Sequence, residues 1–571
     1  MASSKLSLVS FLPIVGWLKT YRRQDVSDDL FAGVITAILL VPQGIAYAVL
    51  AGLPPQLGLY ASIVPPVIYA FLGTSRTLSV GPVSIAAIMV ASALTAPEIQ
   101  ALGNPVQSGL ILSAESGAIM LAMALLRMGG LVNFISHPVL AGFTSGAALL
   151  IIGSQLPQVF GVKLPSCGLD WACYPQVLHG FSPATLVLSL SALALLVFFG
   201  PPLTGLLKKL RVNLSVVTAV SKCGPLLAVI LATSAVSYWQ LTDYAVIVVG
   251  TIPSGFPSPS LNFVDVEKWR LLLPYASFIG LIAYVESVAI AKVTANLRGE
   301  KIVPNQELIA LGGANLVSAL FGGMPVAGGF SRTMVNFSAG ARTQMAMLVA
   351  AAILALSVIF LSDWFADIPK AALAAIILVA IFRLVRIKHI FHTWQYDSGD
   401  GMAELATLLG VLILGIEQGI ALGIVLTIAS HLRKTSQPHI AVVGRVPDTE
   451  HFRNVKRHGV ETWHHLLLVR IDESITYANI SYIEDYLNGE LRRQPNTKHV
   501  VLILNSVNDI DTTALESLEA INQSLQMSGK TLNLAEAKGP VLDKLQKTDF
   551  LEQIKPGQVF FRTEDAVKGL G

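Results

Sequence analysis

Leu78-Ser-Val-Gly-Pro-Val-Ser84 and Met324-Pro-Val-Ala-Gly-Gly-Phe-Ser-Arg-Thr333 are the two stretches that decide how this chain folds. Each is a short apolar segment interrupted by glycine and proline, in the corresponding position of one half of a long hydrophobic region. A bilayer-spanning helix needs about 20 apolar residues with every backbone group bonded internally, so these segments predict two broken helices. Paired broken helices in two halves indicate a transporter whose substrate binds near the membrane midplane. The positive ends of two facing half-helices favour an anion.

The composition supports a membrane protein. Of 571 residues, 53% are hydrophobic and only 13% are charged, and the mean hydropathy is +0.63. Soluble domains average about 25% charged residues, so most of this chain is expected to lie in a lipid bilayer. The formal net charge of +3 says little about partners, because the location of the charges matters more than their sum. We expect no nucleic-acid partner.

Apolar runs crowd residues 30–436 and predict about fourteen spans, several of them too short to cross a bilayer alone. The expected spans are 30–50, 57–72, 81–96, 108–127, 132–156, 182–200, 213–236, 271–292, 305–321, 329–340, 344–361, 368–384, 401–415 and 417–432. A polar stretch, Ser254-Gly-Phe-Pro-Ser-Pro-Ser260, separates the seventh span from the eighth. Seven spans per half force the two halves into opposite orientations, which is the inverted-repeat arrangement.

The positive charges test this topology. With residues 1–29 as a cytosolic N-terminal segment without a cleavable signal peptide, most basic residues near the spans fall on the cytosolic side. They are Arg76, Arg127, Lys208, Lys209, Arg211, Lys292, Arg298, Lys301, Arg342, Arg383, Arg386, Lys388, Arg433 and Lys434. The outer side receives Lys163, Lys268, Arg270 and Lys370. The sequence therefore predicts cytosolic termini and an inner or plasma membrane location.

Residues 437–571 change character, because charges become frequent and apolar runs shrink to strand length. His439-Ile-Ala-Val-Val443, Leu466-Leu-Leu-Val-Arg-Ile471 and Val500-Val-Leu-Ile-Leu504 are expected strands, and helical patterns cover 477–491 and 512–527. Strands that alternate with helices predict a small cytosolic α/β domain.

Two charged residues stand inside expected spans. Glu286 lies in the middle of the eighth span, where an ionisable group is costly and indicates function. Desolvation favours the protonated form of a buried carboxyl, so Glu286 is a candidate proton carrier. Arg332 follows Ser331 at the start of the second broken helix and adds positive charge for an anion. The alternative is that Glu286 and Arg332 only compensate each other, and both interpretations can hold.

The other polar candidates are weaker. Gln43 and Tyr47 lie four residues apart on one face of the first span and offer an amide and a hydroxyl to a ligand, but such pairs also join helices. Cys167 and Cys173 share one polar loop, and the sequence leaves open whether they form a disulfide. No metal-ligand cluster or catalytic nucleophile emerges, so we expect no cofactor and a protein that is not an enzyme.

Together these features resemble the sulfate permease (SulP) family, also called solute carrier family 26, over essentially the whole chain. The resemblance rests on Val41-Pro-Gln-Gly44, Pro55-Gln-Leu-Gly-Leu-Tyr60, Gly73-Thr-Ser-Arg76, Ser79-Val-Gly-Pro82, Asn305-Gln-Glu-Leu308 and Ser331-Arg332. Leu57 departs from the family signature, which usually has an aromatic residue there. The C-terminal part resembles the STAS domain of this family. Its Asp511-Thr-Thr-Ala514 stands where related regulatory domains carry a phosphorylatable Ser or Thr, which makes Thr512 and Thr513 candidate regulatory sites.

The resemblance implies a polytopic α-helical membrane protein with a seven-plus-seven inverted repeat and a small cytosolic α/β STAS domain. A core domain from spans 1–4 and 8–11 would move against a gate domain from spans 5–7 and 12–14, in an elevator-like shift within a homodimer. The implied domains are 1–29, 30–436 and 437–571. The implied pocket comprises Gln43, Tyr47, Pro82, Val83, Glu286, Ser331 and Arg332. The family position of Glu286 is acidic in many proton- or cation-coupled members and apolar in some exchangers, so the resemblance favours coupled uptake.

Several functions remain open from the sequence. Proton-coupled uptake of a small inorganic oxyanion, with sulfate first, is the leading hypothesis, and sodium-coupled bicarbonate uptake and anion exchange are alternatives. A nucleobase carrier shares the architecture, but Arg332 at a helix N-terminus suits an anion better. A hypothesis of another class makes the membrane part an anchor for a signalling STAS domain, although an anchor would need neither broken helices nor buried charge.

Overall fold

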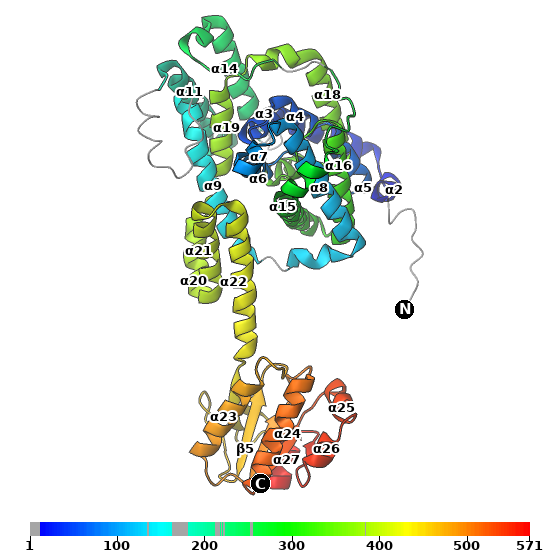
Figure 1. Ribbon diagram of the computed structural model, residues 1–571, viewed down its shortest axis with the longest axis vertical. Helices are drawn as coiled ribbons and strands as arrows, with labels where there is room; N and C mark the ends of the chain where they lie inside the picture. Colours follow the sequence, from blue (N-terminus) through cyan, green and yellow to red (C-terminus); the bar gives the residue numbers. More distant parts are fainter. Residues whose placement is uncertain are drawn as a thin grey trace. The chain divides into compact units, whose positions relative to one another are not determined.

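The computed structural model of the chain describes residues 12–133, 136–162, 181–211, 217, 220, 223–251, 255–382 and 384–571. The chain divides after Thr427 into two compact units. The first unit is helical and the second contains a six-stranded sheet (Figure 1). Cys167, Cys173 and most of residues 212–222, where the seventh span was expected to begin, lie outside the described residues.

The helices of the first unit pack as two groups, which lie side by side in Figure 1. One group contains α3 Arg23–Leu50, α4 Pro55–Tyr60, α5 Val64–Leu72, α6 Ser84–Thr95, α8 Pro105–Leu125, α15 Val266–Arg298, α16 Pro304–Leu320, α17 Phe330–Ser338 and α18 Met345–Ala366. The other group contains α9 His137–Phe160, α11 Pro183–Phe198, α14 Gly224–Trp239, α19 Lys370–Phe382, α20 Ile387–Tyr396 and α21 Ser398–Ile413. The remaining helices are α2 Pro13–Leu18, α7 Pro97–Gln100, α12 Pro201–Lys209 and α22 Ile416–Ser436, and two 3₁₀ turns cover Met128–Asn133 and Leu241–Tyr244.

Six helices in the described part of the chain are long and apolar enough to cross a bilayer, and a seventh if the bent pair α11 and α12 counts as one span. The expected spans are visible as helices with shifted ends, and that at 57–72 is divided into α4 and α5. The total of fourteen spans stays a prediction. The first helix begins at Arg23, earlier than the expected 30, because the side chain of Asp25 accepts a hydrogen bond from the backbone N–H of Arg22 at 2.8 Å.

The two glycine-interrupted segments form short strands that pair with each other. Val80–Gly81 is β1 and Ala327–Gly328 is β2, and they run antiparallel. Each strand leads into a helix, β1 into α6 and β2 into α17. Both α3 and α15 pack against α6 and α17, so the broken segments are held between two long helices. The predicted interruption of both helices is confirmed in the structure.

Each half contributes a buried carboxylate that binds a loop of the other half. Asp29 on α3 accepts hydrogen bonds from the backbone N–H groups of Arg342 at 2.6 Å and Thr343 at 3.0 Å. Glu307 on α16 accepts from the Tyr69 hydroxyl at 2.6 Å and the Thr74 N–H at 2.8 Å. These contacts fix the two halves against each other, because a buried acceptor that loses its donors costs about 1–3 kcal/mol.

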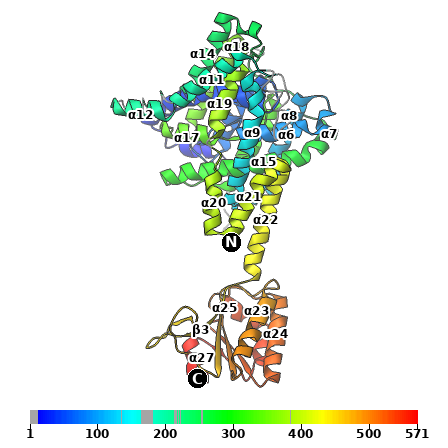
Figure 2. The same cartoon turned by 90° about the vertical axis from the view of Figure 1, so that its left-hand side faces the viewer.

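The second unit is an α/β domain with strand order β4-β3-β5-β6-β7-β8. Its strands are β3 Ile440–Arg445, β4 Phe452–Asn454, β5 Leu466–Ile471, β6 His499–Ile503, β7 Thr531–Ala535 and β8 Val559–Phe560. Its helices are α23 Ile480–Arg493, α24 Thr512–Met527, α25 Gly539–Leu545, α26 Phe550–Gln553 and α27 Thr563–Leu570. The helices α23 and α24 cover one face of the sheet and α27 covers the other (Figure 2).

Candidate functional site

A cavity of about 830 Å³ lies between the two helical groups of the first unit. The first group borders it with α3, α6, α15 and α17, and the second with α11, α14 and α19, together with α12. Its polar and charged lining residues are Gln43, Tyr47, Ser84, Thr204, Lys208, Glu286, Ser331, Arg332 and Arg386. Six of the seven predicted pocket residues therefore line one cavity, and Pro82 is the exception.

The cavity reaches the first turns of both broken helices. Val83 is the N-cap of α6 and Gly329 is the N-cap of α17, and neither helix has a side chain that caps its first N–H groups. The N–H groups of a first helical turn have no partner within the helix and carry partial positive charge. Two such ends beside one cavity give it a positive potential before any side chain is counted.

Arg332 adds a fixed charge to this potential. Its side chain is 2% exposed, and its Nη1 donates to the Pro82 carbonyl at 2.6 Å and to the Gln43 amide oxygen at 3.4 Å. Its Nε and Nη2 have no acceptor in the described part of the protein. The guanidinium is therefore held by the segment before α6 and by α3, with donors left over for a ligand.

Glu286 enters the cavity from α15. Its Oε2 is buried without a hydrogen-bond partner among the described residues, and no ion pair joins it to Arg332. The next residue, Ser287, accepts a hydrogen bond from the Gly328 N–H at 2.7 Å, which fixes α15 against β2. Glu286 and Arg332 therefore make no direct contact of the kind expected if they only neutralised each other.

Gln43 and Tyr47 lie on the same face of α3, and both side chains are buried at the cavity wall. Ser331 is exposed to the cavity in the first turn of α17. Pro82 does not line the cavity, and contributes its carbonyl to Arg332. The structure thus brings the predicted residues together, with Pro82 as a support for Arg332.

Replacing Gly329 with alanine is expected to displace Arg332. A Cβ at this position would lie 2.9 Å from the Arg332 Nη2, which is closer than real Cβ contacts. The guanidinium must then shift within the cavity, which changes the direction of its free donors, and we expect anion affinity to fall about threefold. Equilibrium binding of radiolabelled sulfate to the purified protein checks this. Gly489→Ala is the control, because Gly489 has no positive φ and an added Cβ there meets nothing within 4 Å, and this protein should bind sulfate as the parent does.

The candidate regulatory residues Thr512 and Thr513 lie in the first turn of α24, and both are exposed. The N-cap of this helix is Asp511, whose Oδ1 accepts from the Ala514 N–H at 2.8 Å. A carboxylate is a good acceptor at the positive end of a helix. The hydroxyls of Thr512 and Thr513 therefore do not cap the helix.

Two features of the structure were not predicted from the sequence. Lys208 on α12 and Arg386, the N-cap of α20, line the same cavity, but both are distant in sequence from every motif that carries the family resemblance. Glu115 on α8 is 1% exposed and neither carboxyl oxygen has a partner in the described residues. A lone acid within the apolar run of α8 was the signal that could have found it.

Comparisons with known proteins agree with this arrangement. Residues 26–407 match the sulfate permease family and residues 455–567 match the STAS domain. The "Probable sulfate transporter 4.2" of Arabidopsis thaliana is 32% identical over 98% of this chain and 83% of that protein. The "High affinity sulfate transporter 2" of Stylosanthes hamata is 30% identical over 99% of this chain and 87% of that protein.

Solved structures show the same fold. The murine solute carrier 26 family member A9 anion transporter in its inward-facing state superimposes with a TM-score of 0.89 at 22% identity, over 100% of this chain and 95% of that one. The transmembrane domain of the cyanobacterial bicarbonate transporter BicA gives 0.59 at 21% identity, over 72% of this chain and 98% of that one. The predicted fold class, a helical membrane protein with a C-terminal STAS domain, is confirmed. This chain belongs to the sulfate permease family.

Proposed function

We propose that this protein is a secondary active transporter that takes up a small inorganic oxyanion, with sulfate as substrate and protons as the coupling ion. The observation that supports this is a single cavity bounded by two helix N-termini, a buried Arg332 with unused donors, and an unpaired Glu286. Relatives that are 30–32% identical are named sulfate transporters, which supports sulfate as the first substrate to test.

In this proposal the anion lies between the ends of α6 and α17. Backbone N–H groups and the free donors of Arg332 bind its oxygens, and Ser331, Gln43 and Tyr47 add neutral hydrogen bonds. Charge-assisted hydrogen bonds of this kind are about twice as strong as neutral ones. Removing water from sulfate is costly, so a site with several fixed donors is needed.

Glu286 supplies the coupling. An ionised Glu286 would repel an anion in the same cavity and offset the charge of Arg332, whereas a protonated Glu286 leaves that charge to the substrate. Proton and anion therefore enter together, and uptake rises as the outside becomes more acidic than the inside.

The remaining features of the proposal concern the whole molecule. The group that contains α3, α6, α15 and α17 is the core domain, which carries the substrate past the other group in an elevator-like movement of a homodimer. The chain is an integral membrane protein, placed in the inner or plasma membrane with cytosolic termini, and its domains are 1–29, 30–436 and 437–571. The similar murine structure is described as inward-facing, which supports a cavity open to the cytosol.

Transport into proteoliposomes tests the proposal. Sulfate, bicarbonate, chloride and a dicarboxylate are offered in turn, with an imposed proton gradient, an imposed sodium gradient, or neither. Proton-driven accumulation of sulfate is expected. Accumulation of bicarbonate driven only by sodium would replace the proposal by the sodium-coupled alternative, and strict dependence on an internal anion would make the protein an exchanger. Deleting residues 438–571 should leave sulfate binding in place, whereas the anchor hypothesis assigns function to that part alone.

Lys208 and Arg386 are expected to attract anions into the cavity without contributing to the final binding. Both side chains are exposed and have no carboxylate partner in the described residues. The double replacement by glutamine should raise the KM for sulfate on the side to which the cavity opens by about three- to tenfold and weaken its salt dependence, because rim charges act on encounter. The maximal rate should change little. Lys209→Gln, next to Lys208 but outside the cavity, is the matched control in flux assays at several ionic strengths.

A further inference from the structure

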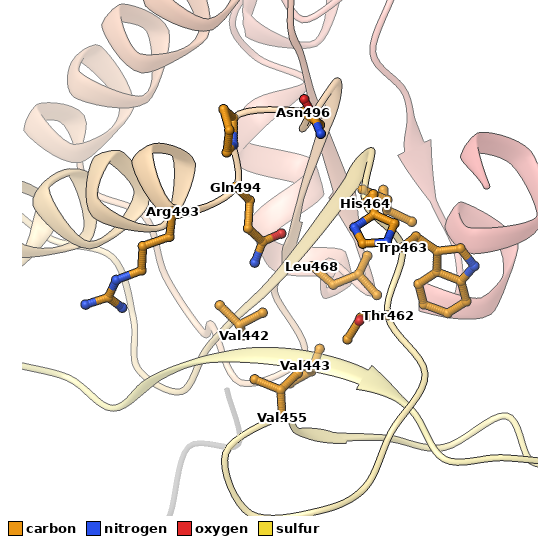
Figure 3. Close-up of a pocket in the computed structure, with 12 residues that line it drawn as sticks. Val442, Val443, Val455, Thr462, Trp463, His464, Leu468, Arg493, Gln494 and Asn496 are labelled. Atoms are coloured by element: carbon orange, nitrogen blue, oxygen red, sulfur yellow. The ribbon is translucent and has the colours of Figure 1, made fainter.

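A cleft in the second unit has the features of a ligand site of its own. It has a volume of about 380 Å³, within the range of small-molecule sites. It is lined by Val442, Val443, Val455, Thr462, Trp463, His464, Leu466, Leu468, Arg493, Gln494, Pro495 and Asn496 (Figure 3). None of the sequence predictions pointed to it.

The cleft arises where the sheet divides. The strand β3 pairs with β5 only over Ile440–Val442, and from Val443 onward its partner is β4. The end of β3 and the beginning of β5 therefore separate. Val442 and Val455 line the opening from the core under α23 and α24, and Val443 and Leu468 line it from the core under α27, so the cleft has an apolar floor where the two faces of the sheet meet.

Four polar side chains surround this floor without partners of their own. Thr462, His464, Gln494 and Asn496 line the cleft, and none of their side chains hydrogen-bonds to another group in the described chain. Figure 3 shows the Gln494 amide directed toward Leu468 and the valines, the His464 ring across the opening from it, and Arg493 extending away. These unused hydroxyl, imidazole and amide groups provide donors for an oxygen-rich ligand.

The neighbouring hairpin, residues 446–461 with β4, carries unpaired positive charge. Arg453, Lys456 and Arg457 are exposed and form no ion pair in the described chain. Of its three acids, Glu450 pairs with Arg562 and Glu461 with Arg445, whereas Asp448 forms no ion pair in the described chain, so three unpaired cations stand against one unpaired carboxylate. Val455 points into the cleft between these cations, so the positive charge borders its apolar floor.

We propose that this cleft binds a small amphipathic organic anion, a phosphate or carboxylate ester or acid with an apolar body. The apolar part rests on the valines and Leu468, and the anionic group is held by Gln494 and His464 in the field of the basic hairpin. This site lies beside the beginning of β5, whereas Thr512 and Thr513 follow the loop after β6, so the two are separate. The inference does not depend on the transported substrate.

Hydrogen exchange of the full-length protein in nanodiscs of neutral lipid tests the inference, with phenyl phosphate as the probe. Slower exchange is expected in peptides that cover residues 455–468 and 491–497, and no change in 539–553. Gln494→Met keeps the size of the side chain but removes the amide, and should weaken the affinity about tenfold. Arg457→Gln should weaken it two- to threefold, and Lys547→Gln, which removes an exposed charge outside the cleft, should not weaken it.

The outcomes are distinct. Equal affinity in the Gln494→Met protein, with unchanged thermal unfolding, would exclude this cleft as the binding site. Equal protection by inorganic phosphate would show that the apolar floor has no role, and no protection by phenyl phosphate would overturn the proposal outright. Protection that appears without the probe in nanodiscs of anionic lipid, and nowhere else, would identify a lipid headgroup as the occupant and also overturn it.

Discussion

Replacing Arg332 with glutamine is expected to weaken sulfate binding about 10- to 150-fold, since hydrogen bonds to a charged group contribute about 1.5–3 kcal/mol. The guanidinium is buried, two of its nitrogens have no protein acceptor, and it is the one basic side chain of the described residues that reaches the cavity from the core group of helices. Glutamine keeps a polar side chain but removes both the charge and the fork of donors.

Equilibrium binding of radiolabelled sulfate to purified protein in nanodiscs measures the change directly. Arg332→Lys should lie between the two extremes, because the ammonium keeps the charge but cannot hold the Pro82 carbonyl and a substrate with the geometry of a guanidinium. Arg342→Gln is the control, since this arginine pairs with Asp28 at the surface and should bind sulfate as the parent protein does. Undiminished affinity in a well-folded Arg332→Gln protein would remove Arg332 from the binding site.

Much of the first unit could be predicted because its signals are local. Glycine and proline in the segments before Ser84 and Phe330 prevent continuous helices, and this effect depends on backbone chemistry more than on distant contacts. Glu286 stood out for a similar reason, because an acid within an apolar run is conspicuous wherever it points. The sequence could therefore propose the broken helices and the acid, and a family resemblance supplied the rest of the pocket.

What escaped prediction depends on distant packing. Lys208 follows the bend after α11 and Arg386 follows α19. They reach the cavity only because α14 and α19 pack on α3 and α11 packs on α14 and α19. Pro82 looked like a pocket residue from its motif, but its carbonyl is used by Arg332 instead. The cleft beside Trp463 was hidden for the same reason, because the division of a sheet depends on strand register and leaves no local pattern.

Replacing Glu286 should abolish proton-driven accumulation of sulfate without abolishing sulfate binding. In Glu286→Gln the side chain keeps its size and polarity but cannot exchange a proton. We expect proton-driven accumulation of sulfate to vanish, while sulfate binding and sulfate–sulfate exchange remain, because the positive groups of the cavity are intact. A gradient of one pH unit is equivalent to about 1.4 kcal/mol per proton, so the parent should concentrate sulfate about tenfold per coupled proton and the variant should not.

Uptake into proteoliposomes at a series of external pH values checks this, with the internal pH fixed. The parent rate should rise as the external pH falls, since the anion enters with a protonated Glu286, and the variant rate should be flat. Glu300→Gln removes a carboxylate that pairs with Arg76 at the surface and should keep the parent profile. Full accumulation in Glu286→Gln would assign the proton to another group, for which Glu115 is the first candidate, because it is the other buried carboxyl of the described core helices that has neither oxygen paired. Loss of both sulfate binding and sulfate accumulation would instead make Glu286 a binding residue and refute its role in coupling.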